Sequence, residues 1–332
     1  MVEALFFEPV DLKLAIVGYG NVGRALMRLF REKRQEYSFR ITGIHTLHHG
    51  TAMNAAGLDA DPEFGPPVPC FEAFLDGARA DALVELTTLD PLTGEPAASH
   101  MRAAFARGMH VVTANKGPIA HCYASLRDEA EGRGVMFRFE STVMDGAPVF
   151  NLWRNNLPAV EVLGFTGALN STSKIVVETM ESSGSFADGL AAARNLGITE
   201  GDGSYDVEGW DSACKTAALA NVLLDACTTP QQVYRRGITR LTPKRVAAIA
   251  KRGKTVRLVS RARRTASSSA ARVLLQVRAE ILDRTDILAS AGGTSNLILF
   301  HTDLMGTFGT VSVNPTVEQT AYGVFSDLVS LL

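Results

Sequence analysis

The chain contains 332 residues, 46% hydrophobic and 20% charged, with 33 Lys and Arg against 35 Asp and Glu. This length predicts about two domains with a sizeable core, and the composition is typical of a globular protein. A net charge of −2 provides no basic footprint, which argues against nucleic acid as a partner. No apolar run approaches the ~20 residues of a membrane span, and acidic residues near the N-terminus argue against a signal peptide.

The cysteines are too few and too widely spaced for a disulfide framework. No two of them form a C-x-x-C pair; they are Cys70, Cys122, Cys214 and Cys227. We therefore expect reduced thiols in a cytoplasmic protein.

The first 140 residues alternate apolar strand candidates with helical patterns. Residues 12–17 form a short apolar run, which an amphipathic helix follows. Further strands are predicted at residues 39–45, 82–86 and 109–113. This alternation predicts an α/β fold with a doubly wound parallel sheet, covered by helices on both faces.

The pattern changes after Glu140, which predicts a second domain. We expect strands at residues 164–170, 273–282 and 297–303, and helices at residues 173–181, 186–196, 207–226 and 319–332. The basic, serine- and alanine-rich segment at residues 257–272 is predicted to be a solvated loop rather than an anion-binding site.

A glycine-rich turn follows the first strand and opens the first helix. It consists of Gly18, Tyr19, Gly20, Asn21, Val22 and Gly23. The pattern G-x-G-x-x-G is weak alone, but between a strand and a helix it is typical of a dinucleotide-binding site. Gly18 permits the tight turn, Gly20 lets the backbone approach a pyrophosphate, and Gly23 lets the helix pack closely. The free N–H groups at the helix N-terminus would bind the phosphates.

The residues after the second strand bear on the choice of cofactor. Residues 43–50 contain no carboxylate, although a site of this type usually places one there to hold the ribose hydroxyls. Its absence favours NADP over NAD. His48 or His49 would contact the extra phosphate, unless they are simply exposed loop residues.

The densest group of ionisable residues lies between Glu200 and Lys215. Asp211 and Lys215 are four residues apart and share one face of a helix, and Asp206 lies near the helix start. Spacing alone favours a capped helix with a surface ion pair. The alternative is a lysine held among carboxylates in a cleft, where it donates a proton.

A set of motifs occurs in a characteristic order along the chain. They are the glycine-rich turn, Glu85–Thr88, VVTANKGPIA at 111–120, FESTVMDGAP at 139–148, GALNST at 167–172, residues 196–215 and QTAYGVFSDL at 319–328. With these motifs the chain resembles the homoserine dehydrogenase family, in the short form without a C-terminal regulatory domain. The Thr-Ala-Asn-Lys and Asp-x-x-x-Lys motifs are the specific ones.

The resemblance implies an architecture and an activity. Residues 1–140 and 305–332 would form a Rossmann-type nucleotide domain, and residues 141–304 an α+β substrate and dimerisation domain. The protein would be an NAD(P)-dependent oxidoreductase that interconverts L-homoserine and L-aspartate 4-semialdehyde in threonine and methionine biosynthesis. It would form a homodimer.

The resemblance also implies roles for individual residues. Lys215 would be the proton donor and acceptor, with Lys116 and Asp211 in the same pocket. The substrate would be bound by Asp206, Asp211, Thr172 and, through its amino group, Glu200. The ribose and nicotinamide end of the cofactor would be lined by Thr87, Thr88, Asn115 and Lys116. A monovalent cation, Na⁺ or K⁺, would lie near Glu140 with the carbonyl of Val143 as a ligand.

Three segments depart from the family pattern. Ser173-Lys174 stands where an asparagine and a tyrosine are usual, Gly203 where a proline is usual, and Ser312–Thr316 where a glycine-rich turn touches the nicotinamide. The departures leave open a related dehydrogenase that acts on a different hydroxy- or amino-acid. A dinucleotide-binding sensor without turnover is a third interpretation, although a sensor has no chemical need for both lysines beside Asp206 and Asp211.

Overall fold

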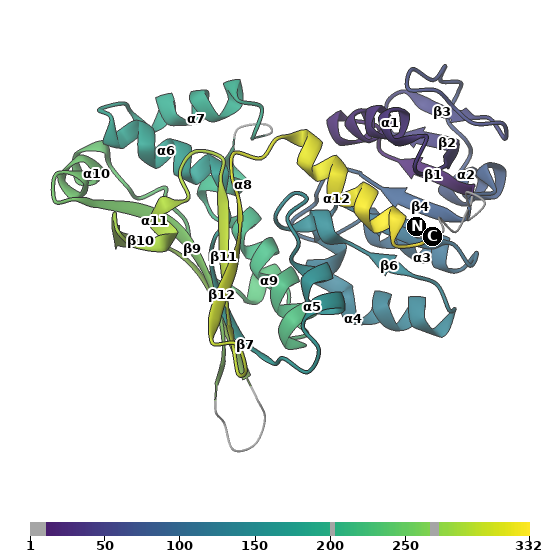
Figure 1. Cartoon of the computed structure of the whole chain (residues 1–332). Helices are drawn as coiled ribbons and strands as arrows, with labels where there is room; N and C mark the ends of the chain where they lie inside the picture. The colour runs from purple at the N-terminus through teal and green to yellow at the C-terminus, as the bar shows by residue number, and fades with distance from the viewer. Residues whose placement is uncertain (1–10, 200–202, 266–271) are drawn as a thin grey trace, which may run out of the picture.

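Two six-stranded sheets with helices packed around them form the structure, a computed structural model that describes residues 11–199, 203–265 and 272–332. In Figure 1 the first sheet lies on the right, and the long strands of the second sheet run down the centre and left of the view. Among the described residues, no helix has the length and apolar character needed to cross a membrane.

The first sheet has the strand order β3-β2-β1-β4-β5-β6, in which β3 alone runs antiparallel to its neighbour. Its strands are β1 (Leu12–Val17), β2 (Phe39–Thr46), β3 (Gly50–Met53), β4 (Ala82–Glu85), β5 (His110–Thr113) and β6 (Phe137–Arg138). The central strands are almost wholly buried, as apolar strands covered on both faces should be. The doubly wound parallel sheet predicted from the sequence is confirmed.

Helices cover both faces of this sheet. One face packs against α1 (Asn21–Lys33) and α12 (Val317–Val329), with Leu26 and Val324 in the shared core. The other face packs against α2 (Phe71–Ala78), α3 (Ala97–Phe105) and α4 (Lys116–Gly132), with Phe74, Met101 and Ile119 in the core. The last helix, α12, therefore returns to the first sheet and lies beside α1, as the yellow ribbon in Figure 1 illustrates.

The second sheet has the order β12-β11-β7-β9-β10-β8 and is antiparallel except for the β10–β8 pair. Its strands are β7 (Val162–Ala168), β8 (Tyr234–Arg236), β9 (Lys254–Thr265), β10 (Arg272–Asp283), β11 (Asn296–Thr302) and β12 (Thr307–Ser312). The helices of this part are α5 (Phe150–Asn156), α6 (Ser171–Glu181), α7 (Phe186–Asn195), α8 (Ser204–Val207), α9 (Trp210–Leu224), α10 (Pro243–Ala250) and α11 (Ile287–Ser290). Short 3₁₀ turns occupy Glu140–Thr142 and Pro230–Gln232.

Two local predictions are wrong. The basic segment at residues 257–272 is not a loop in its described part, because β9 extends to Thr265 and pairs along its whole length with β10. Its arginines have partners that make burial tolerable: Arg257 is only 4% exposed and pairs with Glu178 at 3.1 Å. The helix predicted at residues 207–226 is present as α9, but its predicted start is wrong: Gly209 adopts a left-handed conformation with φ +86°, so α9 begins at Trp210.

The chain returns to the first sheet later than residue 305. Strand β12 pairs with β11 in the second sheet, and the first sheet regains the chain only at α12. We therefore propose a domain division in which the second domain extends to about the end of β12 and α12 alone completes the first domain.

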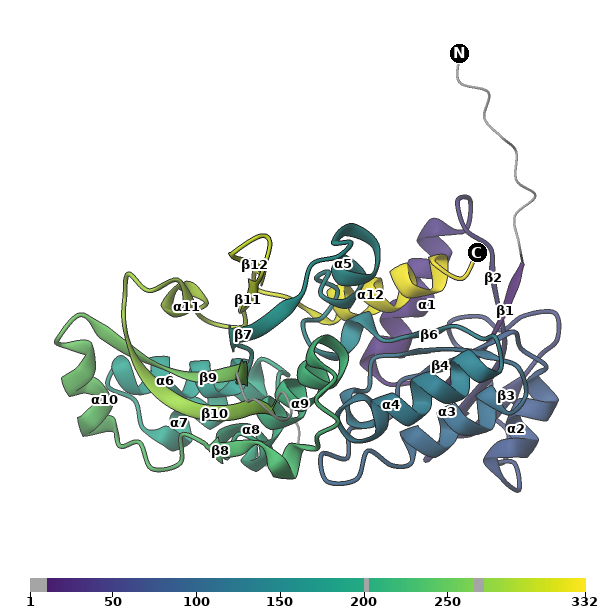
Figure 2. The same ribbon diagram turned by 90° about the horizontal axis from the view of Figure 1, so that it is seen from below.

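The two sheets are joined through α4 and α9, which lie side by side in Figure 2 and share one hydrophobic core. Asn221 of α9 is buried, and its side-chain amide donates to the carbonyls of Ile119 and Ala120 in α4 at 3.1 and 3.2 Å. The Asn221 amide also donates to the Thr228 carbonyl, and its oxygen accepts the Thr228 backbone N–H. This side chain fixes α9, and the residues it carries, against the first domain.

Replacing Asn221 with alanine should lower the free energy of unfolding by about 2 kcal/mol or more, because the buried groups it bonds lose their partner. Urea denaturation measures the change. The matched control Asn155→Ala removes an exposed amide and should stay within about 0.5 kcal/mol of the parent. An Asn221 variant as stable as this control would contradict the role of the contact.

Candidate active site

The predicted site residues gather where the two domains meet. They come from the segments that follow β1, β4, β5 and β7, including the first turns of α1, α4 and α6, and from α8 and the first two turns of α9. The carboxyl edge of a doubly wound sheet is the usual ligand-binding edge, because strand ends and helix N-termini converge there. In this chain α9 adds its own first turn to that edge.

The centre of the site is a carboxylate shared by two lysines. Lys116, the first residue of α4, lies 3.3 Å from one oxygen of Asp211, and Lys215 lies 3.4 Å from the other. Lys215 also donates to the backbone carbonyl of Leu169 at 2.7 Å. The surface ion pair that spacing alone favours is therefore wrong, because the side chains of this group are only 14% to 18% exposed.

The charges of this group follow from burial and from mutual attraction. Burial alone would raise the pKa of Asp211, but Lys215 and Lys116 outweigh it and hold this pKa well below its usual range. Burial alone would lower the pKa of Lys116, but Asp211 chiefly reverses this and raises it. At neutral pH Asp211 is therefore a carboxylate and Lys116 a fixed cation.

Asp206 receives a second set of polar contacts beside the first. Its carboxylate accepts from Thr199 at 2.6 Å, Thr172 at 3.1 Å and the Asn170 amide at 2.7 Å. Burial and the neighbouring Asp211 raise the pKa of Asp206. Asn170 also donates to Asp211 at 3.1 Å, so one amide connects both carboxylates.

The turn at residues 18–23 has the shape that a cofactor pyrophosphate requires. Gly18 has φ +86°, and a Cβ there would lie 2.6 Å from the Leu86 carbonyl, so only glycine fits. A Cβ at Gly20 would meet nothing within 4 Å, which leaves open space in front of the α1 N-terminus. Gly23 packs against the Tyr19 ring, whose hydroxyl donates to Ala60 at 2.6 Å. Asn21 and Val22 supply the first turn of α1.

A buried glutamate organises the loops next to this turn. Glu85 ends β4, is fully buried, and accepts from the Thr87 backbone at 3.0 Å and from Thr113 at 3.1 Å. Asn115 caps α4 and donates its amide to Thr87 at 3.1 Å and to the Thr88 carbonyl at 3.5 Å. Thr87, Thr88 and Asn115 are thus joined by hydrogen bonds, and Lys116 directly follows Asn115 in the chain. Their role in binding the cofactor stays a prediction.

Glu140 does not fit the cation ligand suggested from the sequence. Its carboxylate is buried and accepts three backbone N–H groups, from Val149, Phe150 and Asn151, at 2.5, 2.9 and 2.5 Å. These contacts cap α5 and occupy both oxygens. The Val143 carbonyl as a cation ligand stays a prediction.

Glu200 lies outside the described residues.

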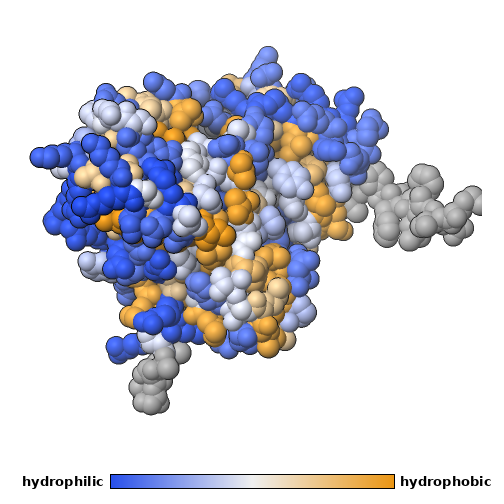
Figure 3. Space-filling model, turned by 60° about the vertical axis from the view of Figure 1, so that its left-hand side comes forward, coloured by the Kyte–Doolittle hydropathy of each residue, from blue (hydrophilic) through white to orange (hydrophobic). Residues whose placement is uncertain are grey.

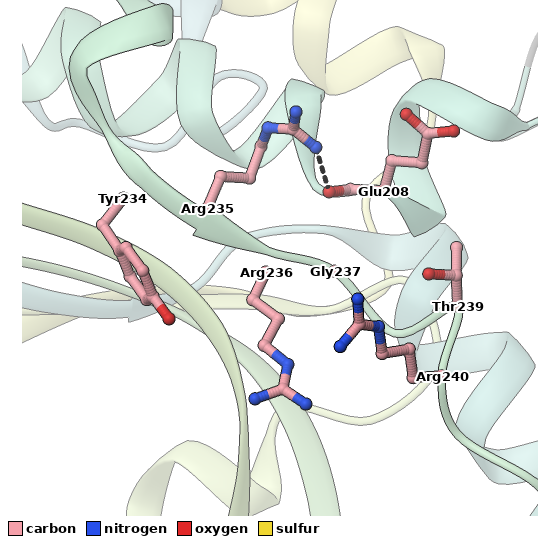
Figure 4. A pocket seen from close by; sticks show the side chains of 7 residues that line it. All are labelled: Glu208, Tyr234, Arg235, Arg236, Gly237, Thr239 and Arg240. Atoms are coloured by element: carbon pink, nitrogen blue, oxygen red, sulfur yellow. Dashed lines mark hydrogen bonds between the residues drawn. The ribbon is translucent and has the colours of Figure 1, made fainter.

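Two surface cavities are separate from the predicted residues. One, of about 590 Å³, lies along β8 and is lined by Glu208, Tyr234, Arg235, Arg236, Gly237, Thr239 and Arg240; in Figure 4 Arg235 reaches the Glu208 carbonyl. The other, of about 650 Å³, follows the open face of the second sheet.

Sequence reasoning missed three functional positions. Asn170 is the N-cap of α6, which begins two residues before the predicted helix, and the preference for Asn at helix N-caps would have identified it. Glu85 is a charged residue at the end of a wholly apolar strand, which is a signal of a buried, partnered carboxylate. Asp145 is partly buried, with φ +58° and a buried Oδ2 atom that has no hydrogen-bond partner among the described residues, and nothing in its sequence neighbourhood indicates this.

Comparison with known proteins agrees with this geometry. The family model for homoserine dehydrogenase matches residues 148–329, and the model for the NAD binding domain of homoserine dehydrogenase matches residues 18–140. The chain belongs to the homoserine dehydrogenase family. As a member of this family it is an NAD(P)-dependent oxidoreductase that acts on a CH–OH group.

Individual homoserine dehydrogenases match over nearly the whole chain. The NAD(+)-dependent homoserine dehydrogenase of Pseudomonas canavaninivorans is 34% identical, over 97% of this chain and 96% of its own length. That of Methanocaldococcus jannaschii is 31% identical, over 96% and 98%. The structure of homoserine dehydrogenase from Thermoplasma acidophilum superposes with a TM-score of 0.84 at 26% identity, covering 96% of this chain and 98% of that one.

Two glycine variants separate folding from cofactor binding in this turn. Gly18→Ala should lower the free energy of unfolding by more than about 2 kcal/mol, because its Cβ clashes with Leu86 in a left-handed backbone. Gly20→Ala should be as stable as the parent but bind NAD(P) about tenfold more weakly, because the methyl group fills the open space before the helix. Denaturation and fluorescence titration measure the two effects. Unchanged cofactor binding by the Gly20 variant would remove the turn from the site.

Proposed function

We propose that this chain interconverts L-homoserine and L-aspartate 4-semialdehyde, with Lys215 as the proton donor and acceptor. The observation that carries the proposal is the buried group of Lys116, Asp211 and Lys215 at the edge where the glycine-rich turn opens. A nicotinamide cofactor, when bound, supplies or accepts the hydride at the substrate carbon. The residues of the chain then have to manage the charge and the proton on the substrate oxygen.

The two lysines divide that work. Lys116 stays a cation, because Asp211 raises its pKa against the effect of burial, and it stabilises negative charge on the substrate oxygen. Lys215 is held by Asp211 and by the Leu169 carbonyl, which orient its terminal amino group. In the reducing direction the protonated side chain gives a proton to that oxygen and is left as the neutral amine, and in the oxidising direction the neutral amine takes the hydroxyl proton.

Substrate orientation is proposed to fall to Asp206 and Thr172, together with Asp211 and Glu200. Asp206 is supported by the side chains of Asn170 and Thr199, so its carboxylate is held in one position. A substrate with a positively charged amino group suits this acidic side of the site. Cofactor contacts are proposed for residues 18–23, Thr87, Thr88, Asn115 and Lys116.

NADP is the proposed better cofactor, because the turn between β2 and β3 has no carboxylate and exposes His48 and His49. Asp61 is the carboxylate that would favour NAD instead. It lies near the glycine-rich turn, where burial and the charge of Asp61 raise the pKa of Tyr19. One relative is named as NAD(+)-dependent, and a fold neighbour was solved with NADPH. Comparing kcat/KM with the two cofactors decides between these residues, and a preference for NAD would favour Asp61.

A homodimer is proposed to form through the open face of the second sheet. Leu163 and Leu274 are 41% and 54% exposed there. On the side of the molecule drawn in Figure 3 apolar residues gather in patches between hydrophilic ones. Arg261 on this face is already paired with Glu280 at 2.8 Å, so covering it leaves no unpaired charge. A cytoplasmic location is proposed from the four free cysteines.

Lys215→Ala should lower kcat about 10²-fold or more, because the proton of the substrate hydroxyl loses its acceptor. The affinity for NADP should stay near normal, since Lys215 contacts Asp211 and Leu169 rather than the glycine-rich turn. Absorbance of the reduced cofactor measures turnover with homoserine and with a panel of other hydroxy- and amino-acids.

The exposed Lys251→Ala serves as the matched control and should retain full activity. Parental turnover in the Lys215 variant would overturn the assignment of Lys215. Turnover of another panel compound but not homoserine would overturn the substrate, and cofactor binding without any turnover would favour a sensor.

Leu274→Glu should convert a homodimer to a monomer, because a buried interface does not tolerate an unpaired carboxylate. Light scattering after gel filtration measures the molar mass. Leu196→Glu, at an exposed leucine beyond α7, is the control and should leave the dimer intact. A dimeric Leu274 variant would exclude this face as the interface.

A further inference from the structure

Lys174 is a buried lysine that the proposed mechanism does not use. It lies in the first turn of α6 and is only 2% exposed, although an ammonium group is costly to bury without partners. Its Nζ donates to the backbone carbonyl of Ser295 and, at 3.0 Å, to the side-chain oxygen of Asn296. The lysine therefore joins α6 to the turn that precedes β11.

That turn leads directly to the departure at residues 312–316. The Ser295 hydroxyl donates to the Asn314 side-chain oxygen at 3.2 Å and accepts the Asn314 backbone N–H at 3.0 Å. Asn314 has φ +44°, a conformation that an asparagine side chain holds only with such support. Two departures that are far apart in the sequence, at Lys174 and at Asn314, are thus linked through Ser295.

A second branch leads toward the catalytic lysines. The side chain of Asn296 lies near enough to Asp145 to lower the pKa of its carboxyl group, and Asp145 accepts from Thr320 of α12 at 3.4 Å. Asp145 is close enough to Lys215 and Lys116 for both to lower its pKa, against burial, which raises it. On the other side, Ser171 and Glu178 of α6 bind the same turn at Thr294 and Gly293.

We propose that Lys174 is a positioning residue, whose ammonium group holds the turn at residues 293–296, and through it Asn314 and Asp145, in register with the substrate-binding turn of α6. The proposal rests on the proposed function, since it concerns the alignment of substrate and nicotinamide for that reaction. Asn170 is the N-cap of α6, and Thr172 lies in the same first turn as Lys174, so a movement of α6 against the turn at residues 293–296 changes the alignment of the substrate.

The charge of Lys174 supports this role near neutral pH. Burial, with contributions from the cations Lys215 and Arg257, lowers the pKa of Lys174 to about 7, while Glu178 and Asp145 act in the opposite direction. Below this pH the Lys174 ammonium group attracts the side-chain oxygen of Asn296 and the carboxylate of Asp145. Above this pH the neutral amine keeps only its hydrogen bonds. The advantage of the parent over a variant without the amine should therefore shrink as the pH rises through 7.

Lys174→Met, made in the whole chain, is the first variant that tests the proposal. We expect kcat to fall about tenfold, with the KM for homoserine within about threefold of the parent, because alignment rather than binding is disturbed. The ratio of parental to variant kcat should be largest below pH 7 and decline above it. Lys251→Met removes an exposed lysine charge and should change neither quantity.

Ser295→Ala is the second variant, in case Lys174→Met folds poorly. It keeps the carbonyl that Lys174 binds but removes the link to Asn314. It should lower kcat about threefold, and the double variant should be no worse than Lys174→Met alone, since the two act through one connection.

Parental kcat and pH dependence in Lys174→Met, or fully additive effects in the double variant, would overturn the proposal. A parent that turns over a different hydroxy acid but not homoserine would overturn only the proposed substrate, and the same variants are then compared with that compound. A parent inactive with every compound would overturn both.

Discussion

A single, mostly buried carboxylate between two mostly buried lysine side chains is the interaction on which the rest of this structure depends. Asp211 gives one oxygen to Lys116 and the other to Lys215, so neither lysine is left without a counter-charge away from water. Because Lys116 belongs to the first domain and Asp211 to the second, the ion pair also requires the two domains to meet at this point. Removing the carboxylate would leave two cations facing each other, which is why its ionised form is so strongly favoured.

The backbone is built to satisfy that requirement. Gly209 is the N-cap of α9, so this helix begins with Asp211 in its first turn, where a carboxylate is favoured by the helix dipole. Asp206 remains in the short α8, and the Asn170 amide at the end of β7 bonds both carboxylates. Asn221, three turns along α9, secures the same helix to α4. The active-site geometry is therefore fixed at both ends of one helix.

Local patterns predicted what local forces decide. The strand, turn and helix at residues 12–33 follow from short-range periodicity and from glycine geometry, and the structure agrees with them. The Asp211–Lys215 pair was visible as a helical spacing, but its burial was not, since Lys116 and the carbonyl of Leu169 come from distant parts of the chain. The strand at residues 254–265 was missed for the same reason: its arginines resemble a solvated loop until Glu178 and Glu280 appear beside them.

The departures from the family pattern at Lys174 and Asn314 also depend on contacts with distant parts of the chain. Taken singly, a lysine in place of a tyrosine and an asparagine in place of glycine both look unfavourable, one as a buried charge and the other as a strained backbone. In the fold both residues bond to Ser295: its hydroxyl accepts the Asn314 backbone N–H, and its carbonyl accepts from the Lys174 side chain. A chain with the usual family residue at only one of these two positions would keep either the buried lysine charge or the strained asparagine backbone. The pair therefore has to be treated as one structural unit, adjoining the substrate turn at Thr172 on one side and Asp145 on the other.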